Sequence, residues 1–188
     1  RDEPMTTLAA AVPALKDRVL LANGVSKSYA MTGWRIGYAA AAAPLNAAIN
    51  KLQSQMSSCP SSVSQAAAAY ALTADQAFVH DSVAVYKERR DYACARLNAV
   101  PGLSCTVPDG AFYLFPNCAG VIGKRTPDGR MIETDLDFVL HLLDGVGVAA
   151  LQGAAYGLSP YFRLSIATSM EVIREACDRI ERAVAALR

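Results

Sequence analysis

The chain has 188 residues, of which 53% are hydrophobic and 19% are charged, and its formal net charge at pH 7 is +1. This length allows one large domain or parts of two, and the composition is that of an ordinary globular protein. No run of lysine and arginine forms a basic patch, so the sequence does not indicate a nucleic-acid partner. No apolar stretch is long enough for a transmembrane helix, so membrane insertion is not expected either.

The five cysteines are an odd number, are widely scattered and include no Cys-x-x-Cys pair. This usage favours buried thiols in a reducing compartment over a disulfide framework. With only His80 and His141 as histidines, no spacing of metal ligands is present, and we predict no metal. Since a signal-peptide pattern is also absent, we expect a cytoplasmic protein.

The first elements lead to a loop. Residues 6–15 are rich in alanine and are predicted to form a short helix. The apolar run 19–22 is predicted to be a buried strand, which ends at the turn signal Asn23-Gly24. Thr32-Gly33 marks a second turn, and residues 34–38 are predicted to form a second strand. Small residues between the two strands would let the backbone approach a bound group closely.

Lys27 and Arg35 are the only charged residues between Val19 and Asn50. A desolvated lysine favours its neutral form, which is a nucleophile, and arginine offers a planar fork of donors suited to phosphate. Ser26 adds a hydroxyl beside the lysine. The alternative is a solvated surface lysine in a loop, because lysine is almost never fully buried. Composition alone leaves both interpretations open.

Residues 26–38, SKSYAMTGWRIGY, closely resemble the cofactor-lysine segment of class I/II pyridoxal-phosphate aminotransferases, particularly the prokaryotic aspartate aminotransferase branch. This long match with fixed spacing is far more specific than a short glycine-rich pattern, and the resemblance extends over essentially all 188 residues. It implies that Lys27 bonds the cofactor, pyridoxal 5'-phosphate. It also implies that Arg35 binds the cofactor's phosphate, with help from Ser26.

The resemblance implies an α/β architecture, the aspartate aminotransferase-like fold of PLP-dependent transferases. Residues 1–88 would be the C-terminal part of the large mixed-sheet domain that binds the cofactor, and residues 89–188 a small α+β domain. The family's proteins are longer, so this sequence would be roughly their C-terminal half, and the full-length protein would be a homodimer. Because the preceding half carries further cofactor contacts, the chain alone is predicted to be catalytically incomplete.

Three helices are predicted after the loop. Pro44 opens the first, in which Leu45, Ile49 and Leu52 recur on one face. A second helix is expected at 63–72. A long third helix at 76–99, with a solvated face of mixed charge, is expected to cross from the large domain into the small one.

The small domain is predicted to begin with strands at 103–107 and 111–115, joined by a turn in which Gly110 accepts a positive φ. Phe112 and Tyr113, in a segment similar to one of the family, are interpreted as core aromatics. Thr134 is expected to cap a helix through about residue 143, which Gly145 or Gly147 ends.

The end of the chain is predicted to hold strands at 148–151 and 161–167 on either side of a loop at 153–160. Residues 168–171, Thr-Ser-Met-Glu, match a capping box, and an apolar stripe marks a final helix.

Arg163 is the only charged residue between Asp144 and Glu171, in a predicted strand of aromatic and aliphatic residues. Since an unpaired buried arginine is costly, an anion is expected near it. Chemistry alone leaves open a fixed salt bridge with an acidic residue of the other half. In the resembling family an arginine of this strand binds the substrate's α-carboxylate through two parallel hydrogen bonds, and the resemblance favours this role.

The resulting hypothesis is an aminotransferase fragment that acts between an amino acid and a 2-oxo acid, with Lys27 as the catalytic residue and Arg163 as the substrate-binding one. Aspartate is inferred from the family branch only. One alternative is a non-catalytic, aminotransferase-like ligand-sensing domain of a transcription regulator, and another is an aminotransferase of different substrate choice. Nicotinamide binding is not indicated, since no G-x-G-x-x-G follows a strand.

Overall fold

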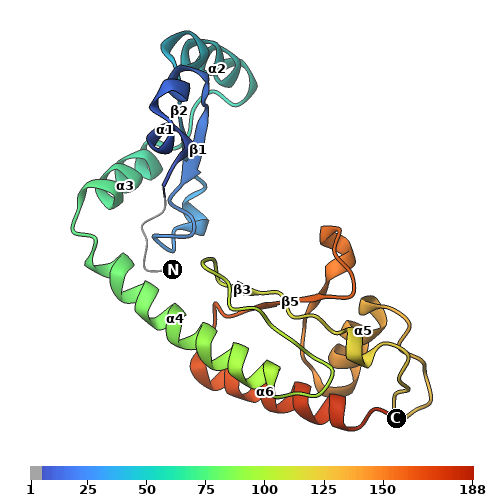
Figure 1. Cartoon of the computed structure of the whole chain (residues 1–188). Helices are drawn as coiled ribbons and strands as arrows, with labels where there is room; N and C mark the ends of the chain where they lie inside the picture. The colour runs from blue at the N-terminus through green and yellow to red at the C-terminus, as the bar shows by residue number, and fades with distance from the viewer. Residues whose placement is uncertain (1–5) are drawn as a thin grey trace. The chain divides into compact units, whose positions relative to one another are not determined.

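The computed structural model describes residues 6–188 and divides the chain into two compact units, a first that ends at Asp81 and a second, Ser82–Arg188. The division falls inside helix α4 (Ala77–Asn98), shown in green in Figure 1. The boundary predicted from the sequence, between residues 88 and 89, lies on the same helix.

The first unit contains a two-stranded antiparallel ribbon and several helices. In chain order its elements are α1 (Leu8–Ala11), the 3₁₀ helix η1 (Pro13–Arg18), β1 (Leu21–Gly24), the 3₁₀ helix η2 (Thr32–Trp34), β2 (Gly37–Ala40), α2 (Ala43–Met56) and α3 (Ser62–Thr73). The helices predicted from Pro44 and at 63–72 are confirmed by α2 and α3. The helix predicted at 6–15 is interrupted, because Pro13 has no N–H to continue α1.

Strands β1 and β2 pair from Leu21↔Ala40 to Gly24↔Gly37. A Cβ on Gly37 would lie 3.1 Å from the carbonyl oxygen of Asn23, so glycine allows the strands to approach where the loop begins. The prediction that residues 19–22 are buried is wrong for the described residues, since Leu20 is 48% exposed and every residue of β2 is exposed. The reason is that a two-stranded ribbon leaves both faces open unless another layer packs on it.

The second unit holds a three-stranded antiparallel sheet in the order β3-β5-β4, with α5, α6 and the rest of α4. Its further elements are β3 (Tyr113–Leu114), the 3₁₀ helix η3 (Ala119–Val121), α5 (Asp135–Val146), β4 (Leu151–Gln152), the 3₁₀ helix η4 (Gly153–Tyr156), β5 (Phe162–Ser165) and α6 (Met170–Ala185). The three strands are shorter than the sequence predicted.

The core of the second unit joins its helices to its sheet. Leu97 of α4, Phe138 of α5, Phe162 of β5 and Ile180 of α6 are fully buried, and the rings of Phe138 and Phe162 meet edge to face at 5.3 Å. Burial of these large apolar side chains is the main stabilising contribution. The unit therefore has its own hydrophobic core, which rigidly supports the central strand β5.

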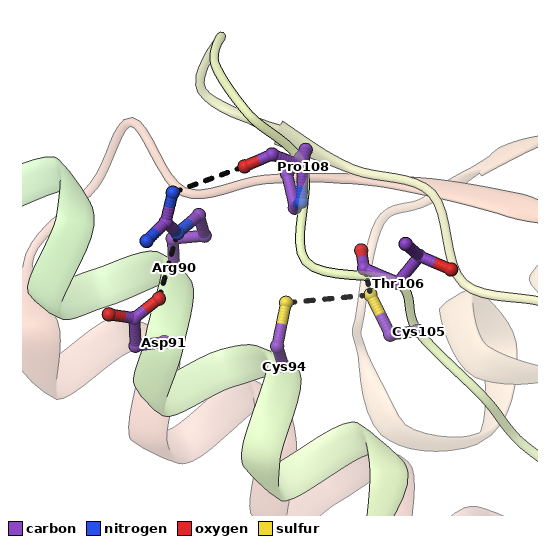
Figure 2. A network of polar contacts seen from close by, with 6 residues as sticks. All are labelled: Arg90, Asp91, Cys94, Cys105, Thr106 and Pro108. Carbon is purple, nitrogen blue, oxygen red and sulfur yellow. Dashed lines mark hydrogen bonds and ion pairs between the residues drawn. The ribbon is translucent and has the colours of Figure 1, made fainter. Parts of the chain in front are cut away.

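The strand predicted at 103–107 is wrong, because this segment makes only the single bridge Ser104↔Asn117. Side chains of α4 take the place of a partner strand. The side chain of Asn98 accepts a hydrogen bond from the N–H of Cys105 at 2.8 Å and donates one to its carbonyl at 2.9 Å. Figure 2 shows Arg90, which donates to the carbonyl of Pro108 at 3.1 Å. These side chains provide hydrogen-bond partners for backbone N–H and C=O groups that would pair with a neighbouring strand in a β-sheet.

The turn after Pro108 also differs from the prediction. The positive φ of 65° belongs to Ala111, and Gly110 is not in the left-handed region. A positive φ is sterically unfavourable for a residue that has a Cβ, so contacts of the residues next to Ala111 must stabilise the turn. One such contact is the packing of Phe112 against Tyr86 of α4, with ring centroids 6.4 Å apart.

All five cysteines are free, and four of them are buried, as predicted, while Cys59 is exposed. The Sγ atoms of Cys94 and Cys105 lie 3.6 Å apart (Figure 2). Burial raises the pKa of the Cys105 thiol to about 12 and raises that of Cys94 as well. These thiols therefore stay protonated near neutral pH and pack as small apolar groups.

The predicted ends of α5 are confirmed. The Thr134 hydroxyl accepts from the N–H of Asp137 at 3.3 Å, the Asp137 carboxylate accepts from the N–H of Thr134 at 2.9 Å, and Gly147 ends the helix with φ 68°. The cap of helix α6 is Ser169, one residue after Thr168, where the predicted capping box begins. The hydroxyl of Ser169 accepts a hydrogen bond from the N–H of Val172.

The cap of α5 predicts a pH-dependent stability. Donation by the Thr134 hydroxyl lowers the pKa of Asp137, so its stabilisation is present above the ordinary carboxyl pKa and is lost as the pH falls through the lowered value. Asp137→Asn should reduce the free energy of unfolding by about 1 kcal/mol at pH 7. This deficit should shrink in denaturant titrations at a pH well below the ordinary carboxyl pKa of about 3.9. An equal deficit at both pH values would contradict this, and Asp144→Asn, in the last turn of α5, is the matched control.

Candidate functional site

The twelve residues between β1 and β2, which we call the lysine loop (residues 25–36), carry three of the predicted site residues. Val25 is fully buried and anchors the start of the loop. The N–H of Tyr29 donates to the carbonyl of Val25, and the N–H of Ala30 donates to the carbonyl of Lys27. The chain therefore turns tightly around Lys27, which places Ser26 and Lys27 at the entry of the loop.

The lysine loop is tied to the helices that follow it. The hydroxyl of Tyr29 donates to Oε1 of Gln76 at 2.7 Å, and the Gln76 amide donates to the carbonyls of Ala71 at 3.1 Å and Ala74 at 2.6 Å. Gln76 thus joins the loop to the end of α3. This connection restrains the turn that carries Lys27.

Two residues of the lysine loop have backbone conformations that L-amino acids rarely adopt. Ala30 has φ 53° and Arg35 has φ 50°. Such conformations cost about 1–3 kcal/mol each and are concentrated at functional sites. The Arg35 guanidinium donates through Nη1 to the carbonyl of Thr32 at 3.2 Å, which orients the side chain over η2.

In the described chain Lys27 and Arg35 are exposed and Ser26 is half-buried. The prediction that Lys27 lies in a water-poor setting is therefore wrong for the described chain. The reason is that no further layer packs on the two-stranded ribbon that carries the lysine loop. The donor set is nevertheless distinctive. The loop offers a primary amine, a guanidinium and a hydroxyl, and no acidic side chain occurs between Val19 and Asn50.

This donor set fits a small molecule that carries an aldehyde and a phosphate. An amine can bond an aldehyde carbon, and a guanidinium binds phosphate with paired, charge-assisted hydrogen bonds. A nearby carboxylate would repel the phosphate, and the loop contains none. The residues present are therefore compatible with pyridoxal 5'-phosphate.

Arg163 lies on β5 in the second unit and is half-buried. Its guanidinium carbon is 4.3 Å from the ring centroid of Tyr113 and 4.7 Å from that of Tyr156. Among the residues that the structure describes, no carboxylate forms an ion pair with Arg163. Two aromatic rings therefore restrain a cation whose N–H groups can still bind an anion.

The sheet explains the contact with Tyr113. Tyr113 of β3 pairs with Ser165 of β5, so Arg163, two residues along the same strand, is its diagonal neighbour on the same face. Diagonal neighbours are within reach of long and aromatic side chains. Phe162 and Leu164 point to the opposite face, toward the core.

Sequence reasoning missed both tyrosines. The sequence predicts that Tyr113 is a core aromatic, yet Leu114 is the fully buried residue of β3 and Phe112 packs against the core cluster. Alternation along the predicted strand could have placed Tyr113 on the face of Arg163. Tyr156 lies in the segment predicted as a loop, where the structure has the short 3₁₀ helix η4, and no periodic signal identifies such a residue.

The predicted site residues fall into two groups. Ser26, Lys27 and Arg35 share the lysine loop of the first unit, whereas Arg163 belongs to the second unit. Within residues 6–188 no cluster of three or more histidine, cysteine, aspartate or glutamate side chains could hold a metal ion. In the same range no helix has the length and apolar character that crossing a membrane requires.

The chain is similar to known proteins over most of its length. Residues 3–180 match the family described as aminotransferase class I and II. An aspartate aminotransferase from Rhizobium meliloti is 53% identical over 171 residues, which are 91% of this chain and 42% of the relative. An aspartate/prephenate aminotransferase from Cereibacter sphaeroides is 47% identical over 186 residues, 99% of this chain and 46% of the relative.

A solved structure is also similar over the whole chain. The crystal structure of the aspartate aminotransferase from Rhizobium meliloti superposes with a TM-score of 0.97 at 49% identity, covering 100% of this chain and 47% of that one. The chain thus spans less than half the length of these relatives. The lysine loop and Arg163 both lie inside the matched region.

Proposed function

Because the chain belongs to the aminotransferase class I and II family, we propose that the protein containing it is a pyridoxal-phosphate-dependent aminotransferase. The observation that carries this proposal is the lysine loop, which combines an amine, a guanidinium and a hydroxyl without an acidic side chain. The family match and the relatives' names support it. The relatives described above are named as aminotransferases, and no observation favours a ligand-sensing regulator.

Lys27 has two roles in this proposal. Its amine would hold the cofactor through the cofactor's aldehyde, and its nitrogen would also move a proton at the substrate's Cα. When bound, pyridoxal phosphate supplies an electron sink for the charge that develops at that carbon. Arg35, with Ser26, holds the phosphate and thereby fixes the cofactor with respect to Lys27.

Arg163 binds the α-carboxylate of the amino acid in this proposal. Its guanidinium can donate two parallel hydrogen bonds to a carboxylate, which fixes the orientation of Cα. The rings of Tyr113 and Tyr156 hold the guanidinium before the substrate arrives. Less side-chain entropy is then lost on binding.

The substrates follow from the relatives. Their names specify aspartate and, for the relative from Cereibacter sphaeroides, prephenate as well, so we propose an amino-group transfer between aspartate and a 2-oxo acid. Residues outside this chain complete the site, so the chain alone is expected to be inactive. We also propose that the complete protein is a cytoplasmic homodimer.

Steady-state assays of the complete protein test the substrate assignment. A panel of amino donors is offered with 2-oxoglutarate, and prephenate then replaces 2-oxoglutarate as the acceptor with aspartate as donor. We expect the highest kcat/KM for aspartate among the donors. Absence of transamination with every donor would contradict the proposed function, whereas a preference for another donor would contradict only the assignment of aspartate.

A further inference from the structure

Asp135 is a buried carboxylate that the proposed chemistry does not use. It is the first residue of α5 and is 1% exposed. The capping box of this helix is formed by Thr134 and Asp137, so Asp135 is not needed to cap it. Its Oδ2 instead accepts hydrogen bonds from two backbone N–H groups far along the chain, those of Ala154 at 3.0 Å and Tyr161 at 3.4 Å.

These two N–H groups lie at the two ends of the segment 154–161, which includes most of η4 and which we call the β4–β5 loop. Gly153, just before it, donates its N–H to the carbonyl of Tyr161 at 2.7 Å, and Leu158 donates to the carbonyl of Gly153 at 3.1 Å. A Cβ on Gly153 would overlap the carbonyl oxygen of Leu158. The loop is therefore folded tightly on itself, and one carboxylate oxygen holds both of its ends.

The β4–β5 loop carries Tyr156, one of the two rings that contact Arg163. Phe115, the residue after β3, packs against this loop: its ring centroid lies 6.0 Å from that of Tyr156 and 5.5 Å from that of Tyr161. A continuous set of contacts thus runs from Asp135 through the loop backbone to Tyr156 and then to Arg163.

The position of Asp135 in the first turn of α5 also suits a carboxylate. The N-terminus of a helix carries a partial positive charge that stabilises a carboxylate in its first turn. The charged acceptor makes hydrogen bonds to backbone N–H groups stronger than a neutral acceptor would. Removal of the charge would weaken both bonds at once and loosen both ends of the loop.

We propose that Asp135 is a positioning residue for Arg163: it holds the β4–β5 loop so that Tyr156 lies over the guanidinium in the orientation that receives the substrate's carboxylate. This inference rests on the proposed function, because it assigns Asp135 a role in carboxylate binding at Arg163. Asp135 does not itself contact the substrate.

The test uses the complete protein and the binding of succinate, a dicarboxylate that cannot be transaminated. Asp135→Asn should raise the Kd of succinate by calorimetry, and the KM of the amino acid, about tenfold, because displacements of about 1 Å at such sites cost up to about 100-fold. The kcat should change much less. Asp137→Asn is the matched control, since it removes a carboxylate two residues away on α5 and should lower the Tm while leaving the Kd unchanged.

Variants of Tyr156 test whether Asp135 acts through this ring. Tyr156→Leu should raise the Kd of succinate as much as Asp135→Asn does, whereas Tyr156→Phe, which keeps an aromatic ring, should have the Kd of the wild type. The double variant Asp135→Asn/Tyr156→Leu should have a Kd no higher than that of either single variant. If Asp135→Asn does not fold, an unchanged Kd in Tyr156→Leu alone overturns the inference.

Other outcomes separate this inference from the proposed function. A normal Kd in Asp135→Asn, or an equal rise in Asp137→Asn, would overturn the positioning role while leaving Arg163 as the carboxylate site. If Arg163→Ala binds succinate as tightly as the wild type does, the carboxylate site itself is wrong and the positioning role falls with it.

Discussion

Replacing Lys27 with alanine in the complete protein is expected to lower kcat for transamination by at least about 10³-fold. On the proposed function the variant loses the amine that would hold the cofactor and move the proton at Cα, and general base catalysis alone contributes about 10²–10⁴-fold. Steady-state turnover of aspartate with 2-oxoglutarate measures this effect. The absorbance of the bound cofactor should change at the same time, because its aldehyde is no longer bonded to a lysine.

Lys51→Ala is the matched control for this prediction. Lys51 is an exposed lysine of α2 in the same unit, outside the lysine loop. Its replacement should leave both kcat and the absorbance unchanged. Turnover by Lys27→Ala at the level of the control would show that another group carries the chemistry.

Arg163→Ala is expected to raise the KM of the amino acid about 100-fold. Loss of two hydrogen bonds between charged groups, at about 1.5 kcal/mol or more each, removes about 3 kcal/mol of binding free energy. The affinity for the cofactor, measured by titration of the apoprotein, should remain close to that of the wild type because Arg163 is not assigned a cofactor contact.

Two further variants distinguish carboxylate binding from a structural role of Arg163. Arg163→Lys keeps the charge but cannot form two parallel hydrogen bonds, so its KM should stay well above that of the wild type. Arg174→Ala removes an exposed arginine of α6 that lies 5.7 Å from the ring of Tyr92, and its KM should be normal. A normal KM in Arg163→Ala would return this residue to the salt-bridge interpretation.

Features set by local chemistry could be predicted from the sequence. The ends of α5 follow from Thr134, which bonds the first turn, and from Gly147, which adopts a positive φ. Pro44 marks the start of α2 for a similar reason, since proline is tolerated in the first turn of a helix. The family resemblance of residues 26–38, confirmed by the match of residues 3–180, depends on a linear pattern as well.

Burial could not be predicted in the same way, because it depends on what other parts of a protein cover. The run at 19–22 has the composition of a buried strand, yet Leu20 is nearly half exposed in the described chain. The segment 103–107 has the composition of a strand, but Asn98 bonds its backbone from α4. In both cases a tertiary contact, or its absence, outweighs the local pattern.

The surroundings of Arg163 show the same limit at the candidate site. Its isolation from other charges in the sequence singled it out, but the two rings that hold it come from β3 and from the β4–β5 loop. No sequence pattern marks Asp135, whose hydrogen bonds to Ala154 and Tyr161 span 19 and 26 residues. Contacts across such distances depend on the folded topology, which periodicity and spacing do not specify.

The central claim is that the amine of Lys27 bonds the cofactor. Treatment of the complete, cofactor-loaded protein with borohydride makes such a bond permanent, and peptide mapping by mass spectrometry then locates it. We predict a phosphopyridoxyl group on the peptide that contains Lys27 and on no other lysine. An unmodified Lys27, with the group attached elsewhere, would contradict the account.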